Sequence, residues 1–280
     1  MERDYTTELK SQAERMSIHD RTVIKQGLMD YKEVFDRMDT LYIIYHYLNE
    51  RDGRGIINDA PKGVRILYAK LANCLIGIIR LLQAGHEGPA AMLLRALFET
   101  YVNLKVILKE NVQERSQLFE DYLFIERSRL TSISDEEKAK NELQLEKVRA
   151  NYHPDRPFSW CWKVVPSKEK DKNDVPKNPT FRELCKHVGR HQGSKYLYGH
   201  LSGAIHTGPS YEKWLNNKDG EMEMGSLFRP GIEKTANLTI AYAGDALAHV
   251  IKYLNPDDEE MLINCIVSLV HQNESIQQNG

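Results

Sequence analysis

The sequence has 280 residues, with 38 Lys and Arg against 40 Asp and Glu, and 41% of its residues are hydrophobic. A chain of this length can bury a substantial core without disulfides or a structural metal, and its net charge of −2 argues against a protein that coats nucleic acid by bulk charge. Its four cysteines are far apart and form no Cys-x-x-Cys pair, which fits a reducing compartment and excludes a cysteine-built zinc module.

The first residues are charged and contain no apolar run, so no signal peptide is expected. The most apolar stretch, residues 71–82, holds Asn73 and Arg80 and is too short and too polar to span a bilayer. We therefore expect a cytoplasmic protein that is not associated with a membrane.

The N-terminal half predicts helices. Residues 1–20 are polar and predict an arm or a loose helix, whereas the apolar residues from 24 to 45 recur at steps of four and three, which predicts one stripe of a long helix. Residues 62–84 and 89–108 predict an antiparallel hairpin with a tight connection between them. Its second helix starts with Pro89 and is apolar nearly all round, so we expect it in the middle of a bundle.

The C-terminal half predicts more helices and one irregular segment. Further helices are expected over residues 112–130, 134–150, 194–206, 232–254 and 256–271. Residues 151–180 hold half of all prolines and two tryptophans, which predicts a long insertion anchored in part by its aromatic side chains. Thr180 and Glu183 fit a capping box that opens a short helix.

No segment alternates as a strand would. The predicted fold class is therefore all-α: a bundle of about eight helices with a long irregular proline-rich insertion. Residues 21–275 would form a single domain interrupted by this insertion, and residues 276–280 would be a tail.

Two charged side chains on the most apolar helix form the first candidate site. Arg95 and Glu99 are four residues apart, and Asn103 continues the same face. Arg before Glu is the weaker order for such a pair, so helix stability alone explains it poorly. Arg95 would hold an anion while Glu99 orients it or acts as an acid or base; the alternative is an ion pair that fixes the packing of two helices.

A second candidate seam lies on the helix expected over residues 194–206. Tyr198, Ser202 and His206 are spaced four apart and therefore share one face. His206 could act as a general base or acid because its pKa lies near neutrality. The alternative is a buried hydrogen-bond network, or a histidine favoured by the helix C-terminus.

Arg182 and His187 fit an Arg-x4-His pattern that recurs in metal-independent ribonucleases of the HEPN class, although one such match is also expected by chance. Glu183, His187 and His191 have the spacing of metal ligands. Glycines interrupt the helix there, so no metal is expected. No other cofactor is predicted.

Basic residues concentrate between Lys163 and Lys195, where nine Lys and Arg stand against four acids, a net charge of +5. With tryptophans nearby, this stretch could contact a phosphate backbone, although a solvated loop would also carry such charges. The candidate RNA- or anion-binding residues are Lys163, Arg182, Lys186, Arg190 and Lys195.

Residues 88–99, Gly-Pro-Ala-Ala-Met-Leu-Leu-Arg-Ala-Leu-Phe-Glu, resemble the signature helix of an all-helical protein family, DUF5677. In that family a Tyr-x-x-x-Ser-x-x-x-His helix follows, and residues 198–206 match it here. The resemblance covers residues 64–254 and implies that four side chains converge between two helices: Arg95, Glu99, Ser202 and His206. The family is loosely similar to HEPN-like bundles, often ribonucleases or their inactive relatives in defence and toxin systems, but this chain lacks their clean Arg-polar-x4-His motif.

Two hypotheses follow. The first is a HEPN-like metal-independent endoribonuclease, in which Arg95 binds the phosphate, His206 moves the 2′-OH proton, and Glu99 and Tyr198 orient them. Such enzymes complete their site across a dimer, so a homodimer is expected, with residues 24–45 as a candidate interface. The second is a non-catalytic helical module that binds a small anion, a nucleotide or a partner protein.

Overall fold

A computed structural model of the chain describes residues 5–50, 55–130, 134–148, 159–165, 167, 178–191, 197, 227–228 and 231–271. This part of the chain contains nine α-helices, two short 3-10 helices and no strand, which confirms the predicted all-α class. The α-helices are α1 (Tyr5–Asp30), α2 (Lys32–Glu50), α3 (Lys62–Gln83), α4 (Glu87–Leu108), α5 (Val112–Ser128), α6 (Asp135–Val148), α7 (Phe181–His187), α10 (Ile232–Leu254) and α11 (Glu259–His271).

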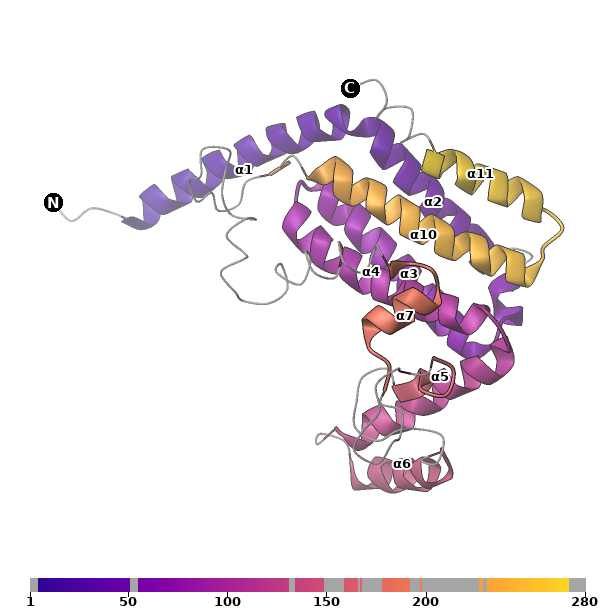
Figure 1. Cartoon of the computed structure of the whole chain (residues 1–280). Helices are drawn as coiled ribbons and strands as arrows, with labels where there is room; N and C mark the ends of the chain where they lie inside the picture. Colours follow the sequence, from indigo (N-terminus) through magenta and orange to yellow (C-terminus); the bar gives the residue numbers. More distant parts are fainter. Residues whose placement is uncertain are drawn as a thin grey trace.

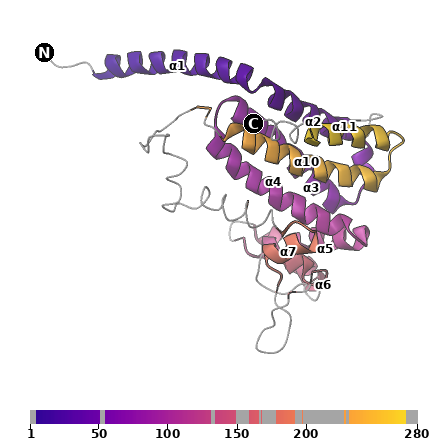
Figure 2. The ribbon, with the colours of Figure 1, turned by 45° about the horizontal axis from the view of Figure 1, so that its top comes forward.

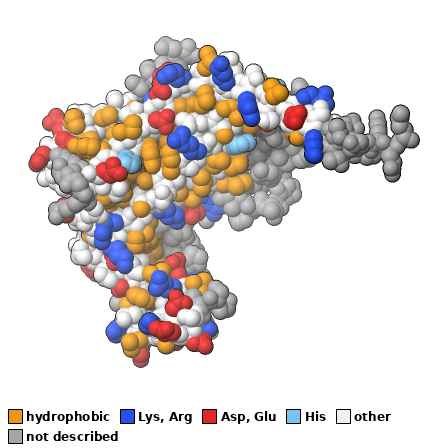
Figure 3. Space-filling view, turned by 180° about the vertical axis from the view of Figure 1, so that it is seen from behind, with side chains coloured by type: hydrophobic (Ala, Val, Ile, Leu, Met, Phe, Trp, Pro, Cys, Tyr) orange, Lys and Arg blue, Asp and Glu red, His pale blue; other side chains and the backbone are white. Residues whose placement is uncertain are grey.

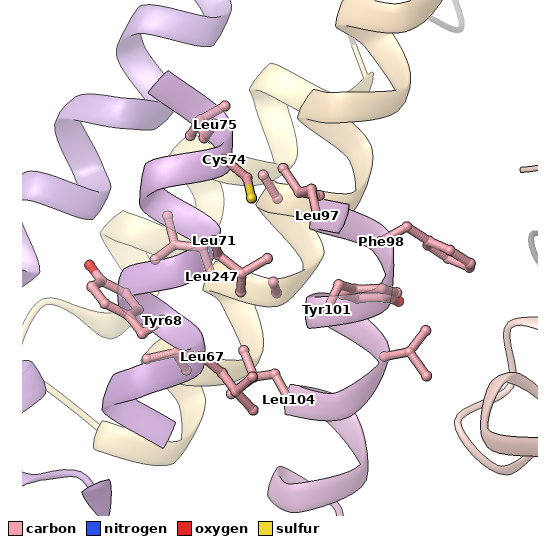
Figure 4. Close-up of a cluster of buried hydrophobic side chains, with 14 of the residues drawn as sticks. Leu67, Tyr68, Leu71, Cys74, Leu75, Leu97, Phe98, Tyr101, Leu104 and Leu247 are labelled. Atoms are coloured by element: carbon pink, nitrogen blue, oxygen red, sulfur yellow. The ribbon is translucent and has the colours of Figure 1, made fainter. Parts of the chain in front are cut away.

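The bundle is built around α3, α4 and α10. The hairpin of α3 and α4 forms the most extensive helix pair, and α10 lies along α4, with α2 and α11 packed outside them (Figure 1). Leucines of α3 and α4 meet Leu247 of α10 in a close-packed apolar layer (Figure 4). Because α4 buries side chains on most of its circumference, it lies in the interior, as its apolar sequence predicted.

The connection between α3 and α4 is a glycine-dependent turn. Gly85 has a φ of 81°, and His86 N–H donates to the carbonyl of Leu81 at 2.7 Å, the long hydrogen bond of a Schellman motif. Pro89 lies two residues inside α4, still within the first turn, where a backbone N–H has no helical partner. The predicted hairpin is therefore confirmed, with α4 beginning slightly earlier than expected.

The long helix expected over the apolar stripe of residues 24–45 is divided at Tyr31. Helical hydrogen bonds still cross the junction, from Tyr31 N–H to Gly27 and from Phe35 N–H to Tyr31. Phe228 stacks on the Tyr31 ring with centroids 6.0 Å apart, and its N–H donates to the Gly85 carbonyl. This contact ties the α1–α2 junction to the α3–α4 turn.

The N-terminal part of α1 projects beyond the bundle (Figures 1 and 2). Leu9, Met16 and Ile18 are exposed there. In α2, by contrast, Phe35 and Tyr45, which belong to the candidate dimer interface of residues 24–45, are buried against the rest of the chain. These two side chains therefore pack within one copy of the chain; the homodimer stays a prediction that light scattering can test.

The α5–α6 pair forms the lower part of the molecule and is joined to the bundle at the start of α3 (Figure 1). Gly63 N–H donates to both Ser116 Oγ and Glu120 Oε1 at 2.9 Å, so side chains of α5 cap α3. Arg115 donates to the Val106 carbonyl at 2.7 Å and thereby satisfies the last turn of α4. These contacts hold α5 against both helices of the hairpin.

By length and composition, one helix among the described residues, α3, could cross a membrane. Of its apolar window 44% is buried inside the molecule, and a core helix passes the same test. The face opposite to that of Figure 1 shows hydrophobic side chains spread over the upper body between single Lys and Arg side chains (Figure 3). The cytoplasmic location and the absence of membrane association stay predictions.

Candidate functional site

The predicted pair on α4 forms as expected from its spacing. Arg95 Nε lies 3.3 Å from Glu99 Oε1, and the Arg95 side chain is only 12% exposed. Asn103 donates from Nδ2 to the Glu99 carbonyl at 2.8 Å, so the three side chains follow one line along the helix. This geometry fits both an anion-holding seam and a packing ion pair.

An aromatic side chain of the insertion covers the end of this seam. Trp160, in the short helix η4 (Ser159–Cys161), is buried and donates from Nε1 to Asn103 Oδ1 at 3.1 Å. Its ring meets Phe119 of α5 edge-on, with centroids 5.3 Å apart. The insertion is therefore anchored by Trp160 on α4 and α5, while most of residues 151–180 lie outside the described part of the chain.

A second polar group lies where α4, α10 and the chain after α7 meet. Asp245 Oδ2 of α10 accepts three hydrogen bonds: from Tyr101 Oη at 2.5 Å, from Arg190 Nη2 at 2.9 Å and from Lys105 Nζ at 3.1 Å. Arg190 also donates from Nε to the Tyr101 oxygen at 2.6 Å. We call these four residues and His249 the Asp245 cluster.

Hydrogen bonds keep Asp245 ionised despite its partial burial. Burial alone would raise the pKa of Asp245, but the hydrogen bonds from Tyr101 and Arg190 and the charges of Lys105 and His249 lower it to about 2. Burial, with help from Asp245, raises the pKa of Tyr101 far above its usual value, so its hydroxyl remains a donor. At neutral pH Asp245 is therefore ionised and Tyr101 keeps its proton.

His249 borders the cluster on the next turn of α10. Its Nδ1 lies 2.7 Å from the Asp245 carbonyl oxygen and 3.6 Å from Asp245 Oδ1. A carbonyl only accepts, so Nδ1 carries the hydrogen, and in the neutral ring the lone pair resides on Nε2. The side chain is 38% exposed. His249 therefore has the tautomer of a potential general base.

The cluster carries more positive than negative charge. Lys105 and Arg190 are two permanent cations around one carboxylate, and the Arg190 side chain is 41% exposed. Asp245 and Tyr101 hold the guanidinium in one orientation, so little side-chain entropy is left to lose when an anion binds. Such an arrangement suits a phosphate or carboxylate group approaching from solvent.

The other predicted basic residues that the structure describes make no hydrogen bond or ion pair with the Asp245 cluster. Lys163 is exposed, with Nζ 5.8 Å from the Trp162 ring, and Arg182 and Lys186 are exposed on α7. Tyr198, Ser202, His206 and Lys195 lie outside the described residues. Among the predicted site residues, the structure thus places Arg95 with Glu99, and Arg190 in the Asp245 cluster.

The Arg-x4-His pair and the expected capping box both lie on α7. Five residues on an α-helix turn through about 140° beyond a full turn, so Arg182 and His187 point in different directions. Thr180 and Glu183 form the capping box, and Glu183 also accepts from Ser167 at 3.0 Å. Within the described ranges, no group of three His, Cys, Asp or Glu side chains could hold a metal ion.

The sequence alone did not identify four of the five members of the Asp245 cluster. Tyr101 and Lys105 are four residues apart on α4, and Asp245 and His249 are four apart on α10. Polar residues at this spacing on two apolar helices are the same signal that singled out Arg95 and Glu99. That signal could have identified each pair, but it could not have shown that the two pairs contact each other.

The fold and these sites define an all-helical protein organised around a hairpin that carries polar side chains on its inner helix. A family model described as a family of unknown function, DUF5677, matches residues 62–222. The chain belongs to this family, which confirms the resemblance seen in residues 88–99 and 198–206. No curated protein matches the chain, and no solved structure matches it.

Proposed function

We propose that the protein is a helical module that binds RNA through its phosphate groups at the Asp245 cluster. The observation that carries this proposal is that Asp245 and Tyr101 hold the half-exposed guanidinium of Arg190 beside a second cation, Lys105. Exposed Lys163, together with Arg182 and Lys186 of α7, belongs to the same +5 stretch and would add longer-range attraction.

Binding of a short fluorescent single-stranded RNA, followed by anisotropy in rising salt, tests this proposal. Arg190→Gln should weaken binding about tenfold and reduce the salt dependence, because one phosphate contact is lost. Arg80→Gln is the matched control, since Arg80 is exposed on α3 and bonds only to Gln83 among the described residues. Equal affinities of the two variants would remove Arg190 from the binding surface.

A second candidate function is metal-independent RNA cleavage, in a defence or toxin context. The observation that favours it is that His249 Nδ1 lies 2.7 Å from the Asp245 carbonyl oxygen, because a ring that donates from Nδ1 keeps Nε2 as a base. The base would take the proton of a ribose 2′-OH, whose oxygen would attack the phosphorus while the 5′-oxygen leaves and takes a proton from water, giving a 2′,3′-cyclic phosphate and a 5′-hydroxyl end. The residues expected from the sequence to contribute are Arg95, Glu99, Tyr198, Ser202 and His206.

Incubation of purified protein with RNA in EDTA tests for this reaction. Cleavage should be lost in either His206→Ala or His249→Ala and retained in His19→Ala, a control on the exposed part of α1. A substrate with a 2′-deoxy sugar at the cleavage position should resist. Binding of RNA without any cleavage by the unsubstituted protein would leave the non-catalytic module as the function.

A further inference from the structure

A pocket of about 430 Å³ lies at another edge of the bundle, between α2, α3 and the short helix η2 (Ile56–Asp59). Its size falls in the range of about 300–1,000 Å³ that is typical of small-molecule sites. Among the described residues, no member of the Asp245 cluster or of the Arg95–Glu99 seam lines it. Nothing in the family match assigns a role to this pocket.

The floor of the pocket is aromatic. Tyr45 and Tyr68 are buried, with ring centroids 5.0 Å apart. Their hydroxyls are used inside the protein, where Tyr45 donates to the Ala243 carbonyl at 2.9 Å and Tyr68 donates to the Tyr45 carbonyl. Tyr68 points away from α4, on the opposite side of α3 (Figure 4). Because Tyr45 and Tyr68 are only 1% and 4% exposed, they close the floor without a free hydroxyl group, and the partly exposed tyrosine ring in the pocket is that of Tyr42.

The rim of the pocket is polar. Within the described part of the chain, the side chains of Tyr42, Asn49, Arg65 and Asn73 make no hydrogen bond or ion pair to protein, and the last three are exposed. His46, also on the rim, pairs with Glu50 at 3.0 Å. Among the described residues that line the pocket there is no carboxylate side chain, and Arg65 brings a positive charge.

One glycine shapes the wall beside Asn49. Gly55 has a φ of 73°, and a β-carbon built there would lie 2.0 Å from the Asn49 carbonyl oxygen. The chain can therefore approach the end of α2 this closely only without a side chain at position 55. That approach brings Ile57 and Asn58 of η2 against α2, where they line the pocket.

We propose that this pocket binds a mononucleotide, with the base inside it beside the Tyr42 ring and the phosphate at Arg65. The asparagine amides carry both donors and acceptors, which suits the edge of a nucleobase, and an arginine fork suits a phosphate. A hydrocarbon ligand would bury these polar groups without partners. A cationic ligand would meet Arg65 with no compensating carboxylate among the described lining residues.

Calorimetric titration with the four ribonucleoside monophosphates, their nucleosides and inorganic phosphate tests the proposal. At least one monophosphate should bind with one site per chain, and Arg65→Gln should weaken it at least fivefold while leaving the affinity for its nucleoside unchanged. Lys70→Gln is the matched control, because Lys70 is exposed on the same helix and does not line the pocket.

Ala69→Phe places a ring at the mouth of the pocket and should abolish binding of both nucleotide and nucleoside, with helical content confirmed by circular dichroism. Binding that survives Ala69→Phe, or that falls equally in Arg65→Gln and Lys70→Gln, would overturn the proposal, as would no monophosphate binding at all. Arg190→Gln should leave this binding intact, which separates it from RNA binding at the Asp245 cluster.

Discussion

Replacing Asp245 by Asn should destabilise the protein by about 2 kcal/mol at pH 7. The cluster lowers the pKa of Asp245 from 3.8 to about 2, and each pKa unit corresponds to about 1.4 kcal/mol. The side chain is 26% exposed, so solvent screens part of this energy. Asn keeps the size of the side chain and an oxygen for Tyr101, but it leaves Arg190 and Lys105 without their counter-charge.

The sign of the pH dependence follows from the lowered pKa. A carboxyl group that is more acidic in the folded state stabilises that state fully above its unfolded pKa, near 4, and loses this effect as the pH falls through about 2. The difference in unfolding free energy between the natural protein and Asp245→Asn should therefore be largest above pH 5 and shrink steadily between pH 4 and pH 2.

Denaturant unfolding followed by circular dichroism, repeated across this pH range, measures the difference. Asp257→Asn is a suitable control, because Asp257 is exposed and forms no ion pair among the described residues. An Asp245→Asn protein as stable as the control at pH 7 would refute the reasoning. So would a stability difference that does not change between pH 5 and pH 2.

Three further outcomes can be checked with standard measurements. Cys265 should be the first thiol to react with a disulfide reagent in the native protein, because it is partly exposed and the other three cysteines are buried. Reaction of all four thiols before the protein unfolds would contradict the burial of Cys74, Cys161 and Cys185. Trp160→Phe should cost about 1 kcal/mol in denaturant unfolding, since it removes the hydrogen bond to Asn103 but keeps an aromatic ring. Gly55→Ala should lower stability by more than about 1 kcal/mol, because of the positive φ and the clash with the Asn49 carbonyl; a protein with unchanged stability would show that the wall near η2 adapts.

Local signals predicted most of the helices. The capping box of Thr180 and Glu183 and the turn at Gly85 each depend on residues within a few positions of each other. A short stretch of sequence is therefore enough to recognise them. The division of the first long helix at Tyr31 was not predicted, because the ring that packs there, Phe228, lies far along the chain. Contacts of that kind are set by the tertiary fold.

The candidate sites show the same limit. Arg95 and Glu99 lie on one helix, so their spacing alone predicted the contact that the structure shows. Asp245 meets Lys105 across 140 residues of sequence, and no short pattern links these two positions. The sequence showed that Arg190 belongs to a basic stretch, but only the fold shows that a tyrosine and a carboxylate orient it.

The position of Arg190 has a consequence for the order in which the chain folds. Its hydrogen-bond partners are 89 residues away on α4 and 55 residues away on α10, whereas the α3–α4 hairpin is made of neighbouring segments. Closing the shorter loop costs less entropy, so the hairpin can form before the distant partners meet. Residues 178–191 should therefore dock late, once α10 has joined α4, and the Asp245 cluster should be among the last native contacts to appear.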